Sequence, residues 1–291
     1  LLAVMLMAFS VSAQDLVVGS YNIRNSNSGD TKNGNGWERR CPVICDQVEW
    51  VGFDVFGLQE VKHNQLVDML NDLPDYDYEG VGRDDGKQAG EYSPILYKKE
   101  RFKKLEGGTF WISETPEKVG VKGWDAALPR ICSYVHLQDK VTKKRFWFFN
   151  LHMDHIGVEA RREGAKLVAR KITEMCGNEP AFVTGDFNVD QNNEAYHTML
   201  QGGVMKDSYK AAAEKVAGAT DYNAALIALL NGNTAPAAAL KCQCAPAAYL
   251  RAIAAARNGN AEGVKKNLET AKKCEKLAAR AAKDIEFAQF N

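Results

Sequence analysis

Polar side chains that could bind a cation follow several apolar stretches of this 291-residue chain. Asp186 and Asn188 come directly after the β-forming run AFVTG, and Glu60 follows the run DVFGLQ. Asn22 and His152 end two further runs of this kind. A single polar residue at a strand end is more often a turn former than a ligand. Four strand ends that carry Asn, Glu, His and an Asp/Asn pair together predict one shared site.

The residue types in this set favour a hard divalent cation. Mg²⁺ binds through one or two carboxylates and through phosphate oxygens of a substrate. Glu60 is the first candidate for this metal, and Asp186 either holds a second cation or orients the attacking water. Asn22 and Asn188 either donate hydrogen bonds to phosphate oxygens or hold the waters of the metal. His152 would donate to a phosphoryl oxygen as negative charge builds up. We therefore expect Mg²⁺ as the cofactor, with Mn²⁺ as the second choice.

The elements that must position these residues alternate between strand and helix up to residue 211. Hydrophobic periodicity predicts strands over 15–24, 53–61, 93–99, 130–139, 144–154 and 180–188. It predicts helices over 41–51, 63–73 and 159–176, and Pro42 would lie in the first turn of the first helix. This alternation predicts an α/β sandwich whose strand-end loops carry the chemistry.

The composition changes near residue 212. Residues 212–291 contain 25 alanines and neither Trp nor His. Ala-rich stretches are separated by Asn-Gly-Asn at 231–233 and at 258–260, which predicts a weak helix–turn–helix repeat with a last helix at about 272–288. This segment resembles the end of a tetratricopeptide-like helical array, and we expect it to bind protein. The predicted organisation is a domain over 14–211 and a helical segment over 212–291.

The first thirteen residues, LLAVMLMAFSVSA, form an apolar run with small residues before Gln14. This pattern is typical of the central and cleavage regions of a secretory signal peptide, here without its charged start. We therefore expect an exported protein, periplasmic or extracellular. Elsewhere the sequence contains no apolar stretch long enough to cross a bilayer.

The overall charge is balanced, with 37 Lys and Arg against 37 Asp and Glu. Residues 212–291 hold 11 of the basic and 7 of the acidic residues, so residues 1–211 hold 26 and 30. No basic stripe supports nucleic acid as a partner, although the chemistry leaves that substrate open. The seven cysteines are interpreted mainly as small apolar fillers, and the sequence leaves one or two disulfides open.

Seven short motifs occur in one order along the chain. They are SYNIRNSN, GLQEV, GRDDGKQAGEYSPILYKKERF, GTFWIS, LPRICSYVHL, NLHMDH and TGDFNVD. Together they resemble the endonuclease/exonuclease/phosphatase superfamily. The resemblance implies a four-layer α/β sandwich, as in deoxyribonucleases, and a phosphoester hydrolase. It places the metal on Glu60 with Asn22 beside it, and it places His152, Asp186 and Asn188 in the active site.

The resemblance also assigns two substrate contacts. Arg130, in LPRICSY, matches an arginine that faces the scissile phosphate, and Tyr92, in GEYSPILY, matches a polar contact near it. Taken by itself, Arg130 would more often be a surface charge, although its planar guanidinium suits a phosphate. Asp154 and His155 match less well and could instead cap the turn into the next helix.

The last motifs of the superfamily have no match here. They are an aspartate beside a strand of Ile-Asp-Tyr type and a terminal Ser-Asp-His. No histidine follows His197, and Asp221 and Asp284 lie in other contexts. We therefore expect a sandwich without its last strands, and a sequence that joins parts of two genes near residue 212, by assembly error or by real fusion. The expected function is a Mg²⁺-dependent phosphodiesterase or phosphatase of reduced activity, and the alternative is a non-catalytic binding protein.

Overall fold

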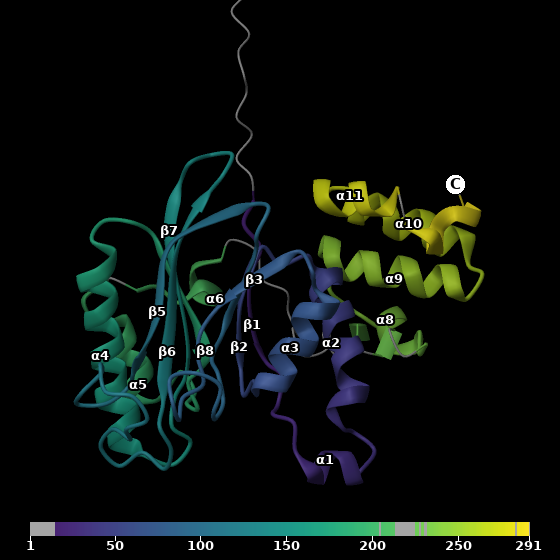
Figure 1. Cartoon of the computed structure of the whole chain (residues 1–291). Helices are drawn as coiled ribbons and strands as arrows, with labels where there is room; N and C mark the ends of the chain where they lie inside the picture. The colour runs from purple at the N-terminus through teal and green to yellow at the C-terminus, as the bar shows by residue number, and fades with distance from the viewer. Residues whose placement is uncertain are drawn as a thin grey trace, which may run out of the picture. The chain divides into compact units, whose positions relative to one another are not determined.

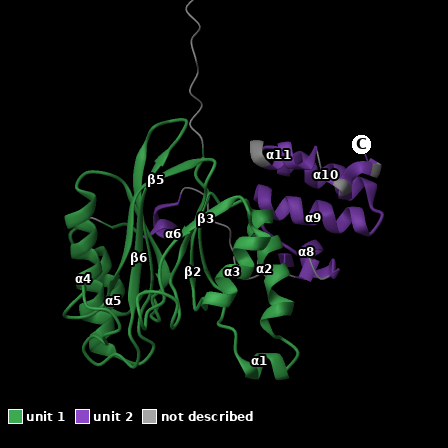
Figure 2. Ribbon diagram, viewed as in Figure 1, with its two compact units in different colours: residues 1–206 green, residues 207–291 purple. Residues whose placement is uncertain are grey.

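The computed structural model in Figure 1 describes residues 15–203, 205–212, 225–226, 228–229, 232–282 and 284–290. The predicted signal peptide, residues 1–13, lies outside these residues. The chain forms two compact units, Leu1–Lys206 and Asp207–Asn291, coloured separately in Figure 2. Each unit is described by itself below.

The first unit contains two four-stranded mixed sheets. The first sheet has the order β1 (Val18–Asn22), β2 (Val55–Gln59), β4 (Ile95–Lys98), β3 (Tyr76–Glu79). The second has the order β5 (Phe102–Trp111), β6 (Ile131–Asp139), β7 (Arg145–His152), β8 (Ala181–Asp186). The pairs β1–β2 and β7–β8 are parallel, and the other pairs are antiparallel. Because of these parallel pairs, the carboxyl ends of β1 and β2 lie together, as do those of β7 and β8.

Helices cover the outer face of each sheet, which gives four layers (Figure 1). Helices α2 (Trp37–Val51) and α3 (His63–Asp72) pack on β1, β2 and β4, whereas α4 (Val158–Cys176) and α5 (Glu194–Leu200) pack on the second sheet. Strand β7 is buried on both of its faces. Phe146 and Phe148 point between the two sheets, while Trp147 and Phe149 join the apolar cluster under α4. The predicted four-layer α/β sandwich is confirmed.

A buried asparagine on β7 ties the two sheets together. The side-chain amide of Asn150 donates to the carbonyl oxygens of Leu58, at 2.7 Å, and of Pro94, at 3.0 Å. Its oxygen accepts from Nε2 of Gln59, at 2.7 Å, and from Oγ1 of Thr184, at 3.0 Å. All four hydrogen-bonding positions of the amide are therefore filled in a site closed to solvent.

We expect Asn150→Leu to lower the free energy of unfolding by about 2–4 kcal/mol, because buried carbonyl and amide groups would lose their partners. Urea unfolding followed by circular dichroism measures the change. Asn192→Leu is the matched control: Asn192 is exposed, and its replacement should change stability by less than about 0.5 kcal/mol. Equal effects of the two substitutions would contradict a specific role for the buried amide.

The helix that was predicted to begin at Cys41 begins at Trp37. Gly36 occupies its N-cap, so Pro42 lies inside the helix and not in its first turn. The earlier start follows from Trp37, whose buried ring packs in the core and whose Nε1 donates to Asp68 Oδ2 at 2.8 Å. The short helix α1 (Ser28–Lys32) precedes it and is capped by Asn27.

The second unit is helical in the residues that the structure describes. Its elements are α6 (Ser208–Ala211), α8 (Ala235–Ala238), α9 (Ala245–Arg257), α10 (Ala261–Ala271), α11 (Glu275–Ala281) and a 3₁₀ helix (Ile285–Phe290). Helices α9 and α10 pack on each other, and Gly259 at φ +68° forms the turn between them. The single last helix predicted over 272–288 is wrong, because α11 begins after its N-cap residue Cys274 and ends at Ala281, and a separate 3₁₀ helix covers Ile285–Phe290. The likeness to tetratricopeptide arrays stays a prediction.

Two further expectations concern the whole chain. All seven cysteines are free thiols, so none of the disulfides that the sequence left open is present, and four of the cysteines are buried, in keeping with apolar filling. Among the described helices, none has the length and apolar character required to cross a bilayer. Every regular element that the structure describes after β8 is helical, and β8 lies at the edge of its sheet.

Candidate active site

The ends of β1, β2 and β8 meet at one place in the first unit. Asn22 ends β1, Glu60 follows β2, and Asp186 ends β8. Nδ2 of Asn22 donates to Oε1 of Glu60 at 2.9 Å and to Oδ2 of Asp186 at 3.0 Å. The two carboxylates that were predicted to share a site are thus joined by a single amide group, although Asn22 and Asp186 are 164 positions apart in the chain.

The backbone at these strand ends adopts an uncommon conformation. Arg24, Glu60 and Asn188 have positive φ angles of 58°, 62° and 51°. They are three of the five non-glycine residues with positive φ in the described part of the chain. Asparagine tolerates this region, whereas for glutamate it costs roughly 1–2 kcal/mol. Such strain persists where the surrounding structure holds it, and it often accompanies a functional site.

The donor set at this place fits a divalent cation. Within the described residues no Lys or Arg forms an ion pair with Glu60 or Asp186, and the guanidinium of Arg24 is held by Asp30 at 2.6 Å. His152 Nε2 lies 3.9 Å from Asp186 Oδ2, too far for a hydrogen bond. Two adjacent carboxylates without a cationic partner repel each other, and Mg²⁺ or Mn²⁺ would relieve that repulsion through oxygen ligands of the preferred type.

His152 is oriented by Asn188. Nδ2 of Asn188 donates to Nε2 of His152 at 3.1 Å and to the carbonyl oxygen of Met153 at 2.9 Å. Because the amide donates, Nε2 accepts and the imidazole proton is on Nδ1, which has no partner in the described residues. Burial, and then the positive charge of Arg130, lower the pKa of His152 below its ordinary value, so the ring is neutral near pH 7.

Arg130 is buried, so the interpretation of this residue as a surface charge is wrong. Its Nε donates to Asp154 Oδ2 at 3.1 Å, and its Nη2 lies 2.9 Å from Nδ1 of His155. Burial by itself would raise the pKa of Asp154, but hydrogen bonds from the amides of Gly157 and Ile156 and from Arg130 outweigh it and hold the pKa well below its usual range. Asp154 therefore caps the turn that leads into α4, which was one of the two roles predicted for it, and it also fixes the guanidinium of Arg130.

A small cleft lies beside this group. Its lining residues are Arg83, Glu91, Tyr92, Ser93, Arg130, Ile131 and His152. Tyr92 was predicted as a polar substrate contact, and it does line the cleft. Its hydroxyl, however, already donates to the carbonyl oxygen of Lys87 at 2.8 Å and lies 3.2 Å from Nδ1 of His63. Tyr92 thus forms a wall of the cleft with its hydroxyl engaged elsewhere.

Two charged residues of the cleft were not predicted. Nη1 of Arg83 pairs with Oε2 of Glu91 at 2.7 Å, and Oε1 of Glu91 accepts from Nδ2 of Asn25 at 2.9 Å. The backbone amide of Asn25 donates to Oε2 of Glu60 at 3.2 Å, so one chain of contacts links the cleft to the carboxylates. The sequence clue was the glycine-rich loop GRDDGKQAGEY, across which Arg83 N donates to Glu91 O at 3.1 Å.

The sequence pattern described as the Endonuclease/Exonuclease/phosphatase family matches residues 19–242, most of the chain. The chain belongs to this family. Members of the family are phosphoester hydrolases that generally depend on a divalent metal. The matched range extends beyond Lys206, the end of the first unit.

Solved structures from Bacteroides thetaiotaomicron are similar to this family member. A family protein of that organism is 54% identical, with a TM-score of 0.65, over 67% of this chain and 71% of the other. A mannosyl-6-phosphatase from it is 53% identical, with a TM-score of 0.66, over 67% and 74%. The catalytic domain of human Nocturnin, 16% identical with a TM-score of 0.54 over 66% and 71%, shows the fold alone.

One curated relative, the uncharacterized protein L388 of Acanthamoeba polyphaga mimivirus, is 30% identical over 162 residues, which is 53% of this chain. The chain spans 60% of the length of that relative.

Proposed function

We propose that this family member is a Mg²⁺-dependent phosphoester hydrolase that acts on a sugar phosphate monoester, with Mn²⁺ as the alternative ion. The observation that carries the proposal is the Asn22 amide that joins Glu60 to Asp186 beside a cleft lined by Arg130 and His152. The name of the 53% identical mannosyl-6-phosphatase supports a sugar phosphate. A phosphodiester is the alternative substrate.

Glu60, Asn22 and Asp186 would hold the cation, which when bound neutralises negative charge on the phosphoryl group. Asp186 also orients the attacking water. Arg130, fixed by Asp154, holds the phosphate oxygens with its remaining donors. His152, kept in one orientation by Asn188, would donate to a phosphoryl oxygen as charge builds up.

The proposal is tested by phosphate release from mannose 6-phosphate and p-nitrophenyl phosphate, and by nitrophenol release from bis-p-nitrophenyl phosphate. We expect faster turnover of the monoesters, restored by Mg²⁺ or Mn²⁺ after removal by EDTA. Faster turnover of the diester would instead indicate a phosphodiesterase. If no substrate turns over while Mg²⁺ still binds, the non-catalytic binding protein becomes the better description.

We further propose that the helical second unit binds a protein and entered this chain by the joining of two genes near residue 212. The change to 25 alanines in 80 residues supports this proposal. One uninterrupted sequencing read across codon 212 tests it, and an intact gene there would exclude an assembly error. Pull-down with residues 207–291 fused to a carrier protein tests for a partner.

We also propose that the protein is exported. The apolar run that ends in Val11-Ser12-Ala13 supports this proposal. Mass spectrometry of the protein expressed with a full leader should show a mature chain that starts at Gln14. A leader that stays uncleaved in the cell would contradict it.

A further inference from the structure

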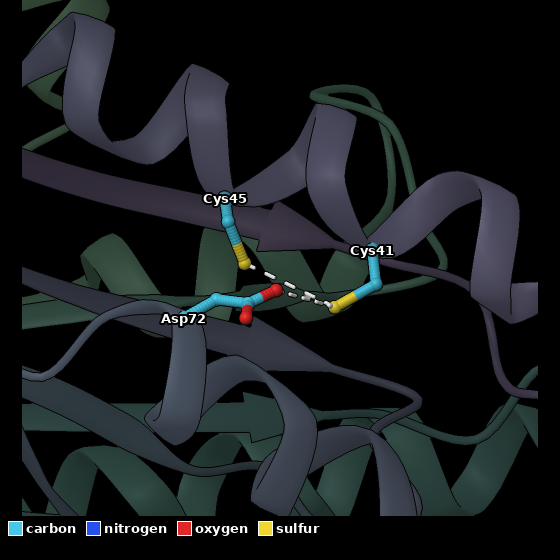
Figure 3. A group of neighbouring side chains, drawn as sticks. All are labelled: Cys41, Cys45 and Asp72. Carbon is cyan, nitrogen blue, oxygen red and sulfur yellow. Dashed lines mark hydrogen bonds between the residues drawn. The ribbon is translucent and has the colours of Figure 1, made fainter.

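A second group of ligand-type side chains lies between helices α2 and α3, apart from the candidate active site. Figure 3 shows Cys41 and Cys45, one helical turn apart on α2, and Asp72, the last residue of α3, pointing toward one another. The two Sγ atoms are 4.0 Å apart, and Cys41 Sγ lies 3.7 Å from Asp72 Oδ2. One ligand atom from each residue lies within 4.8 Å of the other two.

These distances suit one tetrahedral ion. Thiolate sulfur binds Zn²⁺ at about 2.3 Å, so two sulfurs at tetrahedral angles are about 3.8 Å apart. A carboxylate oxygen bound at about 2.0 Å would lie about 3.5 Å from each sulfur. The Cys41 distances are already close to these values, and only Asp72 has to approach Cys45. Asp72 is exposed, so its side chain can rotate without repacking the core.

The surroundings of these three side chains favour a cation bound by all of them together. Asp72 forms no ion pair with any Lys or Arg of the described residues, and its carboxylate faces two buried thiols. A bound cation would stabilise both thiolates and the carboxylate together.

A disulfide fits this place less well. The Sγ atoms would have to approach from 4.0 Å to about 2.0 Å, and a bridge between i and i+4 of one helix departs from relaxed disulfide geometry. Simple core filling accounts for the two thiols but not for the exposed carboxylate directed at them. Two sulfurs with one oxygen match a borderline or soft ion, and not the hard ion expected at Glu60.

We propose that Cys41, Cys45 and Asp72 bind a divalent ion of the Zn²⁺ class, with water as the fourth ligand, and that the ion links α2 to α3. Binding forms two metal–sulfur bonds and one metal–oxygen bond, and releases two thiol protons to solvent. The oxygen ligand and the open fourth position make the site exchangeable, unlike a closed site of four cysteines. The proposal does not depend on the proposed hydrolase activity.

The full chain, reduced by a phosphine and freed of metal, is titrated with Co²⁺ and with Cd²⁺. We expect an ultraviolet thiolate-to-metal absorption band that saturates at one ion per chain. Cys41→Ser and Cys45→Ser should each abolish it. Asp72→Asn should weaken binding by about tenfold or more, since loss of a group merely next to a ligand already costs about that much. Zn²⁺ should raise the Tm of the parent protein more than that of Asp72→Asn.

Control variants separate this site from the other candidates. A chain with Cys242, Cys244 and Cys274 all replaced by serine should keep the band, because those thiols belong to the second unit. Glu60→Gln should also keep it, since the candidate active site offers no sulfur ligand. A band that survives Cys41→Ser, a band that disappears in the triple variant, or no band at all with reduced thiols would each overturn the proposal. Asp72 is exposed, so Asp72→Asn remains informative if a cysteine variant fails to fold.

Discussion

Glu60→Gln should lower kcat for a phosphate ester by about 10²–10⁴-fold, because a metal ligand contributes several kcal/mol to charge stabilisation in the transition state. Glutamine keeps the length of the side chain and an oxygen that can accept from Asn22, so the geometry of the strand ends should survive. The substitution removes the negative charge and turns Oε2, which accepts from the backbone amide of Asn25, into an NH₂ group. Steady-state kinetics with Mg²⁺ measure the loss of activity, and isothermal titration of Mg²⁺ measures the loss of affinity.

The matched control is Glu174→Gln, an exposed residue on α4 whose partner Arg170 lies one turn away, at 3.8 Å. We expect its activity to stay within about twofold of the parent and its unfolding to be unchanged, since surface pairs contribute little. If Glu60→Gln retained more than a tenth of the parent activity in a folded protein, the cation would not be held at Glu60. The proposed ligand set would then be wrong.

Arg130→Met should lower kcat/KM by about 10²–10³-fold and weaken inhibition by inorganic phosphate to a similar extent. A hydrogen bond to a charged group contributes about 1.5–3 kcal/mol, and the guanidinium has donors left after pairing with Asp154. Arg130→Lys should fall between the parent and Arg130→Met, because it restores the charge without the planar pair of donors. Kinetics with increasing phosphate measure both quantities.

Two checks make this result specific. Arg170→Met removes an exposed arginine on α4 and should leave both kinetic constants unchanged. Circular dichroism should show that Arg130→Met is folded, because Asp154 keeps its backbone amide partners. An unchanged inhibition constant for phosphate in folded Arg130→Met would exclude this guanidinium as a phosphate contact.

The elements that the sequence predicted are those with a strong apolar pattern. The observed bounds of β2, β7 and α4 lie within two residues of the predicted bounds at every end, since burial on both faces or along one stripe leaves a clear periodicity. Strands β3 and β5 were missed. The segment of β3 reads YDYE, and β5 contains the exposed residues Lys103 and Lys104 and two glycines, with a bulge before Glu106. Such strands form because their neighbours pair with them.

Some residues of the candidate site could also be predicted from the sequence, and others could not. Glu60, Asp186 and Asn188 could be singled out because a polar residue directly after an apolar strand is conspicuous. Arg83 and Glu91 could not, because charged residues in the polar loop 80–91 look the same whether solvated or buried. Only the pairing of Arg83 N with Glu91 O across that loop brings their side chains into the cleft.

The sequence by itself determines where strands occur along the chain and which residue types stand at their ends, because hydrophobic periodicity and residue type can be read from consecutive positions. Which side chains meet is settled by folding. Asn22 reaches Asp186 across 164 positions because the two sheets pack face to face, and Cys41 reaches Asp72 because two helices share one sheet face. Contacts between distant segments depend on the packing of whole layers, and no local pattern encodes them.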